Sequence, residues 1–133
     1  LVIGGVLAPG LWGLLGWWFG AEHMMLMTMA PKSVTSPIAM LVAGQIGGVA
    51  ALAAVFVLIT GVIGAMIGPA YLSSLGVHSP EARGMALGMT AHAVGTSVAL
   101  QESEECGAFA ALAMSLMGVA TAVFLPVAVS VIV

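Results

Sequence analysis

The sequence carries very little charge. Of its 133 residues, 2 are Lys or Arg and 5 are Asp or Glu, so charged residues make up 5% of the chain. A soluble globular chain carries about 25%. Seven charged side chains cannot solvate the surface of a soluble domain of this length. Two basic residues also cannot neutralise a phosphate backbone, so we expect no nucleic-acid partner.

Cysteine and catalytic motifs are also scarce. Cys106 is the one cysteine, so no disulfide can form within the chain. The three histidines, His23, His78 and His92, have no metal-ligand spacing, and we predict no metal site and no cofactor. No G-x-S-x-G, Walker or H-E-x-x-H motif is present. We therefore expect no catalytic residues and no enzyme activity.

Apolar residues, in contrast, make up 62% of the chain. Apolar runs cover residues 1–20, 49–71 and 107–133, and a lipid span needs about 20 apolar residues. The sequence predicts an all-α integral membrane protein, in which residues 1–133 form a single transmembrane domain. We expect a multi-span helical bundle in contact with the lipid bilayer.

The segment at residues 21–48 is interrupted. Pro31 and Pro37 cannot both lie inside one unbroken helix, because each lacks an N–H and clashes with the preceding turn. We expect a second short helix over about residues 38–46, with Thr35 or Ser36 as its N-cap. The polar stretch between the prolines is therefore predicted to separate two short helices.

A second interrupted segment follows a polar loop predicted at residues 72–80. A Gly- and Met-rich helix is expected over residues 81–92, and the sequence Val-Gly-Thr-Ser at residues 94–97 is expected to break it. Its surface charges have a simple interpretation: Glu81 and Arg83 lie at the membrane surface. The three acidic residues at 102, 104 and 105 form a solvated helix end, with a cation gate as the alternative.

The two interrupted segments are related by an internal repeat. A shift of 61 residues places Thr35-Ser36 on Thr96-Ser97, which gives repeat copies at approximately residues 21–71 and 81–133. If each interrupted helix is broken but crosses the membrane, the copies are parallel; if each is re-entrant and turns back, they are inverted. Arms of about 10–12 residues fit both arrangements. Paired interrupted segments indicate a transporter binding site.

Lys32 is the most informative residue in the two breaks. A charge at bilayer depth costs at least about 2.5–3.5 kcal/mol, so it marks a pathway or a ligand site, and a substrate carboxylate would offset that cost. The alternative is a plain loop in which Lys32 is solvated, the hydroxyls cap a helix and His92 is a buried structural histidine. The candidate substrate-binding residues are Lys32, Ser33, Thr35, Ser36, His92, Gly95 and Thr96.

Residues 31–40, Pro-Lys-Ser-Val-Thr-Ser-Pro-Ile-Ala-Met, resemble the signature segment PKSVTTPIA of the LrgB/CidB membrane proteins. The resemblance continues in Ala-Arg-Gly-Met-Ala-Leu-Gly at 82–88 and Ala-His-Ala-Val-Gly-Thr at 91–96, and it covers nearly the whole chain. Family members are usually longer, so the chain resembles their C-terminal portion. Where the family commonly has a basic residue and a Glu, this sequence has Val98 and Gln101.

The resemblance implies one of two functions. The first is a secondary carrier of small monocarboxylates such as pyruvate, glycolate or glycerate. The alternative is a holin/antiholin-like modulator of murein hydrolase export and cell lysis. The resemblance also implies a multi-pass location in the cell inner (plasma) membrane and a small LrgA/CidA-like membrane partner. We also expect a homo-oligomer. The lysine and the two hydroxyl-rich breaks favour the carrier, which is the function that we predict from the sequence.

Overall fold

The computed structural model describes residues 2–132, and this range is all-helical, with six helices and no strand. The all-α prediction is confirmed for these residues. The helices are α1 (Val2–Trp18), α2 (His23–Met29), α3 (Ser36–Gln45), α4 (Ala50–Ser74), α5 (Pro80–Glu102) and α6 (Glu104–Ile132).

Two helices are long and apolar enough to cross a membrane. They are α4, with 25 residues, and the 28-residue stretch Glu104–Val131 of α6. The run predicted as a span at residues 1–20 forms the 17-residue helix α1. At 1.5 Å per residue α1 is about 25 Å long, which is shorter than the hydrocarbon core of about 30 Å.

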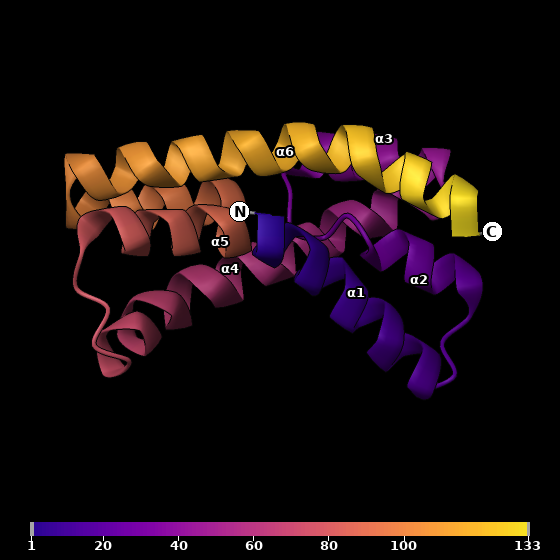
Figure 1. Cartoon of the computed structure of the whole chain (residues 1–133), viewed down its shortest axis with the longest axis horizontal. Helices are drawn as coiled ribbons and strands as arrows, with labels where there is room; N and C mark the ends of the chain where they lie inside the picture. Colours follow the sequence, from indigo (N-terminus) through magenta and orange to yellow (C-terminus); the bar gives the residue numbers. More distant parts are fainter. Residues whose placement is uncertain (1, 133) are drawn as a thin grey trace.

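α6 runs along the whole length of the molecule (Figure 1). α5 lies beside the N-terminal half of α6, and α3 lies beside its C-terminal half. α4 crosses the middle of the molecule and packs against both α3 and α5. α1 and α2 lie at the end opposite to α5. The middle of α4 is therefore the place where both halves of the chain meet.

The helix α5 is a hairpin of two arms. Its backbone leaves helical geometry at His92, where φ is 41° and ψ is −125°. Arg83 on the first arm bonds Glu102 on the second at 2.7 Å, whereas a straight helix would hold these residues about 28 Å apart. The chain therefore turns back at His92, so that residues 80–91 and 93–102 run side by side.

The break predicted at residues 94–97 is therefore wrong by a few positions. These residues are helical and lie in the second arm. Their hydroxyls do not cap a helix but bond inside it, because Thr96 Oγ1 donates to His92 O at 2.8 Å and Ser97 Oγ donates to Ala93 O at 3.1 Å. Gly95 faces the first arm, where a Cβ would overlap the carbonyl oxygen of Leu87. The glycine therefore allows the two arms to touch.

The chain also turns back between α2 and α3. Val49 N donates to Thr28 Oγ1 at 2.9 Å, although a continuous helix would hold these residues about 30 Å apart. A Cβ at Gly48 would lie only 2.7 Å from Thr28 N, so the end of this segment returns along α2. We call α2, residues 30–35 and α3 the first hairpin, and α5 the second hairpin.

The boundaries of two helices differ from those predicted. α3 begins at Ser36 with Thr35 as N-cap, and the Thr35 side chain makes no capping bond. One position that a cap would bond is Pro37, which has no N–H. α4 continues to Ser74 and shortens the predicted loop, and in its last turn Ser73 Oγ donates to Pro69 O at 2.9 Å.

Small residues bring the helices of the second half into close contact. A Cβ at Gly84 would overlap the carbonyl oxygen of Cys106, and a Cβ at Gly88 would overlap that of Ala110, so the first arm of α5 lies directly on α6. Glycines four residues apart are typical of such close helix contacts in membranes. The buried side chains here include Leu87, Ala99, Cys106 and Ala110.

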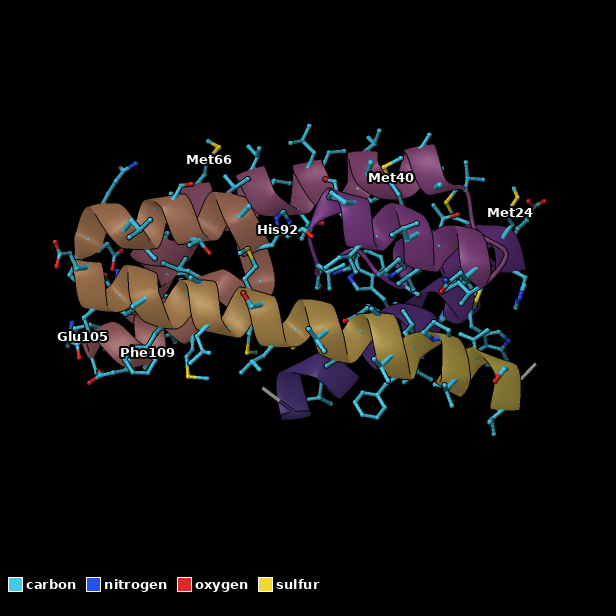
Figure 2. The ribbon with its side chains drawn as sticks, turned by 90° about the horizontal axis from the view of Figure 1, so that it is seen from above. Met24, Met40, Met66, His92, Glu105 and Phe109 are labelled. Carbon is cyan, nitrogen blue, oxygen red and sulfur yellow. The ribbon has the colours of Figure 1, made fainter. Side chains whose placement is uncertain are left out.

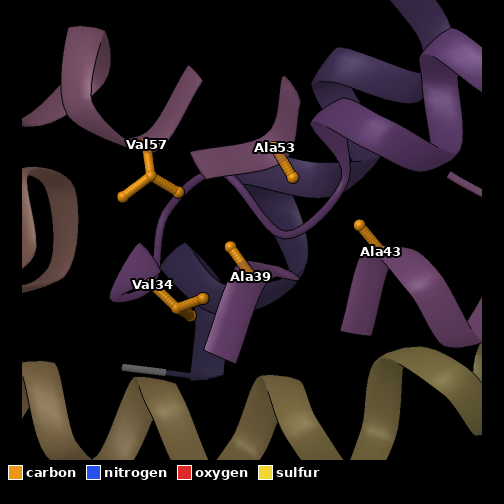
Figure 3. Packing of buried hydrophobic residues seen from close by; sticks show 5 residues of the cluster. All are labelled: Val34, Ala39, Ala43, Ala53 and Val57. Atoms are coloured by element: carbon orange, nitrogen blue, oxygen red, sulfur yellow. The ribbon is translucent and has the colours of Figure 1, made fainter. Parts of the chain in front are cut away.

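The first hairpin has its own small core against α4. Val34 from the loop lies beside Ala39 and Ala43 of α3, and these face Ala53 and Val57 of α4 (Figure 3). All five are nearly or fully buried. This core holds the loop that carries Lys32 against the N-terminal part of α4.

Candidate functional site

Lys32 lies in the loop of the first hairpin and is half-buried. Its Nζ lies over the indole of Trp12 in α1, 5.1 Å from the ring centroid. The negative face of an aromatic ring attracts a cation at this distance. Among residues 2–132 the structure places no carboxylate in ion-pair contact with Lys32. Its charge is therefore compensated by an aromatic ring.

Lys32 opens onto a pocket of about 390 Å³. The wall combines the lysine with two threonines and a mainly apolar surround, which is the usual composition of a small-molecule site. The first hairpin, α1, the middle of α4 and the first arm of α5 all contribute. The lining residues are Trp12, Met29, Lys32, Phe56, Ile59, Thr60, Ile63, Gly64 and Thr90.

Of the candidate site residues, Lys32 alone lines this pocket. The hydroxyl residues Ser33, Thr35 and Ser36 are half-buried and lie outside its lining. The second break supplies Thr90 to the wall in place of the candidates from residues 92–96.

Thr60 and Thr90 were missed from the sequence. Thr60 is a polar residue halfway along a long apolar span, which is a signal that could have been used. Thr90 Oγ1 donates to Ala86 O at 2.7 Å, so its hydroxyl is already satisfied within its own helix. Only the arrangement in space brings these two threonines close to Lys32.

His92 holds the tip of the second hairpin against α4. It is 3% exposed, and its Nε2 lies 3.0 Å from Val57 O. A carbonyl oxygen only accepts, so Nε2 carries the proton of this hydrogen bond. A Cβ at Gly61 would overlap the imidazole, so only glycine leaves room for the ring there. Figure 2 shows His92 at the centre of the molecule, between α5 and α4.

Gly95 and Thr96 also have structural contacts. Gly95 is buried where the two arms of α5 touch, and Thr96 bonds the backbone at His92 while its Oγ1 lies 3.9 Å from the sulfur of Met114. In the described chain these residues fix the shape of the second hairpin. Neither residue is in the pocket lining, whereas Lys32 is.

Arg83 closes the open end of the second hairpin. Its Nε and Nη2 donate to the two carboxylate oxygens of Glu102, each at 2.7 Å. Nη2 also donates to Pro69 O at 3.2 Å, and Nη1 donates to Ser73 Oγ at 3.1 Å and Val77 O at 3.0 Å. A guanidinium has five N–H donors, and all of them have partners here. We call these contacts the Arg83 clasp.

The Arg83 clasp corrects the interpretation of the surface charges. Glu102 is bonded to Arg83, whose side chain is 12% exposed, so this carboxylate is not simply part of a solvated helix end. The two hydrogen bonds from Arg83 hold the pKa of the Glu102 carboxyl below its ordinary value of 4.5. Glu81, Glu104 and Glu105 are exposed, as expected for residues in the first turns of α5 and α6.

Within residues 2–132, no group of three or more His, Cys, Asp or Glu side chains could hold a metal ion. The chemistry of the pocket is that of one ammonium group, two hydroxyls and an apolar wall. Such a wall suits a small organic anion better than a cation, because the site has no carboxylate ligand.

The two long apolar helices, α4 and α6, and the low charge define a helical membrane protein. The model of the LrgB-like family matches residues 1–131, and the chain belongs to this family. The resemblance noted in the sequence is thereby confirmed.

Curated relatives support the same family. The chain is 36% identical to the uncharacterized protein YxaC of Bacillus subtilis, over 96% of this chain and 58% of the relative. It is 35% identical to the holin-like protein CidB of Staphylococcus epidermidis, over 82% of this chain and 48% of the relative. The chain spans about half the length of the curated relatives it matches. No solved structure matches it.

Proposed function

We propose that the chain is part of a holin-like membrane protein that modulates murein hydrolase export and cell lysis. The observation that supports this proposal is the match to relatives named holin-like protein CidB, at 33–35% identity over 82% of the chain. The sequence favoured a carrier, but the comparisons support the holin-like function better.

The proposal includes a multi-pass location in the inner (plasma) membrane. Residues 21–71 and 81–133 would form inverted copies, and the turning back of both hairpins supports this arrangement. Each hairpin would be re-entrant, with its tip near the middle of α4. A small LrgA/CidA-like membrane protein and further copies of this chain are the proposed partners.

A carrier of small monocarboxylates such as pyruvate, glycolate or glycerate is the second candidate function. The pocket beside Lys32 favours it, because the ammonium can pair with a carboxylate and the Thr60 hydroxyl can bond one further oxygen. Lys32 would bind the carboxylate. Ser33, Thr35 and Ser36 would surround the entrance, while His92, Gly95 and Thr96 would keep the opposite hairpin in place.

One experiment separates the two functions. The protein is reconstituted into liposomes, with and without an LrgA/CidA-like partner, and the Lys32→Gln variant is measured beside it. Release of a trapped neutral dye and an anionic dye, with no saturable pyruvate uptake, supports the holin-like function. Saturable uptake of labelled pyruvate that Lys32→Gln abolishes, with the dyes retained, supports the carrier and overturns the holin-like proposal.

A further inference from the structure

The contact between Lys32 and Trp12 joins the one cation of the pocket lining to an aromatic ring of the same lining. Trp12 is 39% exposed and belongs to α1, whereas Lys32 belongs to the first hairpin. α1 rests against the first hairpin where the side chain of Leu26 fills the space beside Gly16. The position of the Trp12 indole therefore depends on how α1 packs against the first hairpin.

An anion in the pocket would compete with the indole for the same ammonium. A charge-assisted hydrogen bond to a carboxylate is stronger than the attraction of an aromatic face, above all where water is excluded. Thr60 lies on the same wall and offers a hydroxyl donor. A carboxylate bonded to the Lys32 ammonium would draw Nζ toward itself and away from the ring centroid, which lies 5.1 Å from Nζ.

We propose that Trp12 is an occupancy-sensitive cap on the Lys32 pocket. Without a bound anion, the indole holds the ammonium at the wall of the pocket. With a small carboxylate bound, Lys32 turns to the anion, and the indole is released together with the adjoining part of α1. This inference rests on the anion site of the second candidate function, and it adds a conformational response that the anion site does not require.

Tryptophan emission tests the response directly. Trp17 and Trp18 are replaced by Phe, so that Trp12 is the one tryptophan left in the chain. The protein in detergent micelles is titrated with sodium pyruvate at an ionic strength held constant with sodium chloride. Binding of labelled pyruvate is measured in parallel by equilibrium dialysis. The expected result is a saturable change in emission with the same midpoint as binding, retained in Lys32→Arg and absent in Lys32→Met.

Removal of the ring gives a second, independent test. Trp12→Leu removes the competitor of the anion, so pyruvate should bind about two- to fivefold more tightly, which is the fold-change that an aromatic-cation contact at an exposed site corresponds to. Trp18→Leu is the matched control: it lies on the same helix and is 82% exposed, away from the pocket lining, and it should leave binding unchanged.

The outcomes separate this inference from the anion site itself. Saturable pyruvate binding with a flat Trp12 emission, or with equal affinity in Trp12→Leu, would overturn the cap and leave the anion site standing. The absence of saturable binding by dialysis would overturn the anion site and the cap together, without affecting the holin-like proposal. A matching midpoint together with tighter binding in Trp12→Leu supports the cap.

Discussion

The two hairpins differ in how their polar groups are used. In the second hairpin, Arg83, Glu102, His92 and Thr96 are all bonded to neighbouring backbone or side chains. In the first hairpin, one buried threonine of α2 accepts a bond from Val49 at the start of α4, and the lysine of the loop has an aromatic ring as its partner. The second hairpin is thus fixed by its polar residues, and the first keeps its cation available.

This difference shows how a chain with few polar residues can combine rigidity with binding. Glycine contacts and the Arg83 clasp hold the second hairpin rigidly against α4 and α6. The first hairpin packs alanines and valines against α4, Val34 of the loop among them, while the Lys32 side chain of the same loop faces the pocket. The comparison predicts that damage to the second hairpin affects stability most, and damage to the first affects binding most.

The largest loss of stability is expected from Gly88→Ala. The new Cβ would overlap the backbone of Ala110, which no rotamer change relieves, so the free energy of unfolding should fall by about 3 kcal/mol. Gly44→Ala is the matched control, because nothing lies within 4 Å of its Cβ position in α3. Unfolding in detergent by titration with dodecyl sulfate gives both values. Equal stability of the two variants would contradict the close packing of α5 on α6.

The second-largest loss of stability is expected from disruption of the Arg83 clasp. Arg83→Met removes all five hydrogen bonds and leaves Glu102 without its partner, and the expected loss is about 2 kcal/mol, since bonds to charged groups contribute about 1.5–3 kcal/mol each where they are shielded. Because the Arg83–Glu102 pair is partly exposed, the expected loss of stability lies near the lower end of that range. The same unfolding titration measures it. A variant as stable as the parent would show that the clasp is dispensable.

The clasp also predicts a pH dependence. Because Arg83 lowers the pKa of Glu102 below 4.5 in the folded protein, the stabilisation is complete above the unfolded value and is lost as the pH falls through the folded value. The unfolding midpoint should therefore drop on the acid side of pH 4.5, and less so in Glu102→Gln. Parallel pH profiles for the two proteins would exclude this contribution.

The smallest effect on stability is expected in the first hairpin. Thr28→Val removes the hydroxyl that accepts from Val49 N and donates to Met24 O at 2.7 Å, so the loss should be about 1 kcal/mol. Thr28→Ser keeps the hydroxyl and serves as the control. Relative to the loss of stability, pyruvate affinity should change more in Thr28→Val than in Gly88→Ala. The reason is that Met29 and Lys32, which line the pocket, come soon after Thr28 in the sequence. Unchanged binding would show that this hairpin is as rigid as the other.

Much of the fold could be predicted from the sequence. The long apolar runs gave α4 and α6, and Pro31 and Pro37 marked the interruption between α2 and α3, because spans and prolines act locally. The turn at His92 could not be predicted. Gly95, Thr96 and Ser97 carry the local signals of a break, while a histidine with φ of 41° depends on Val57 and Gly61 in another helix.

The candidate site was predicted in part. Lys32 was selected from the sequence because a cation is rare in so apolar a chain, and the structure places it in the lining of a pocket. Thr60, Thr90 and Trp12 escaped notice because their role depends on which helices lie side by side. The Arg83–Glu102 pair escaped for the same reason: the partners are 19 residues apart and meet only after the chain turns back.

The full use of the five Arg83 donors has a consequence for the electrostatic field of the whole molecule. The chain has two basic residues and a net charge of −3, and the guanidinium is neutralised in place by Glu102. An anion approaching from solution therefore meets repulsion over most of the surface and a single positive charge, at Lys32. Added salt would screen the attraction at Lys32 and the repulsion from the remaining carboxylates alike, so its two effects on anion affinity would oppose each other.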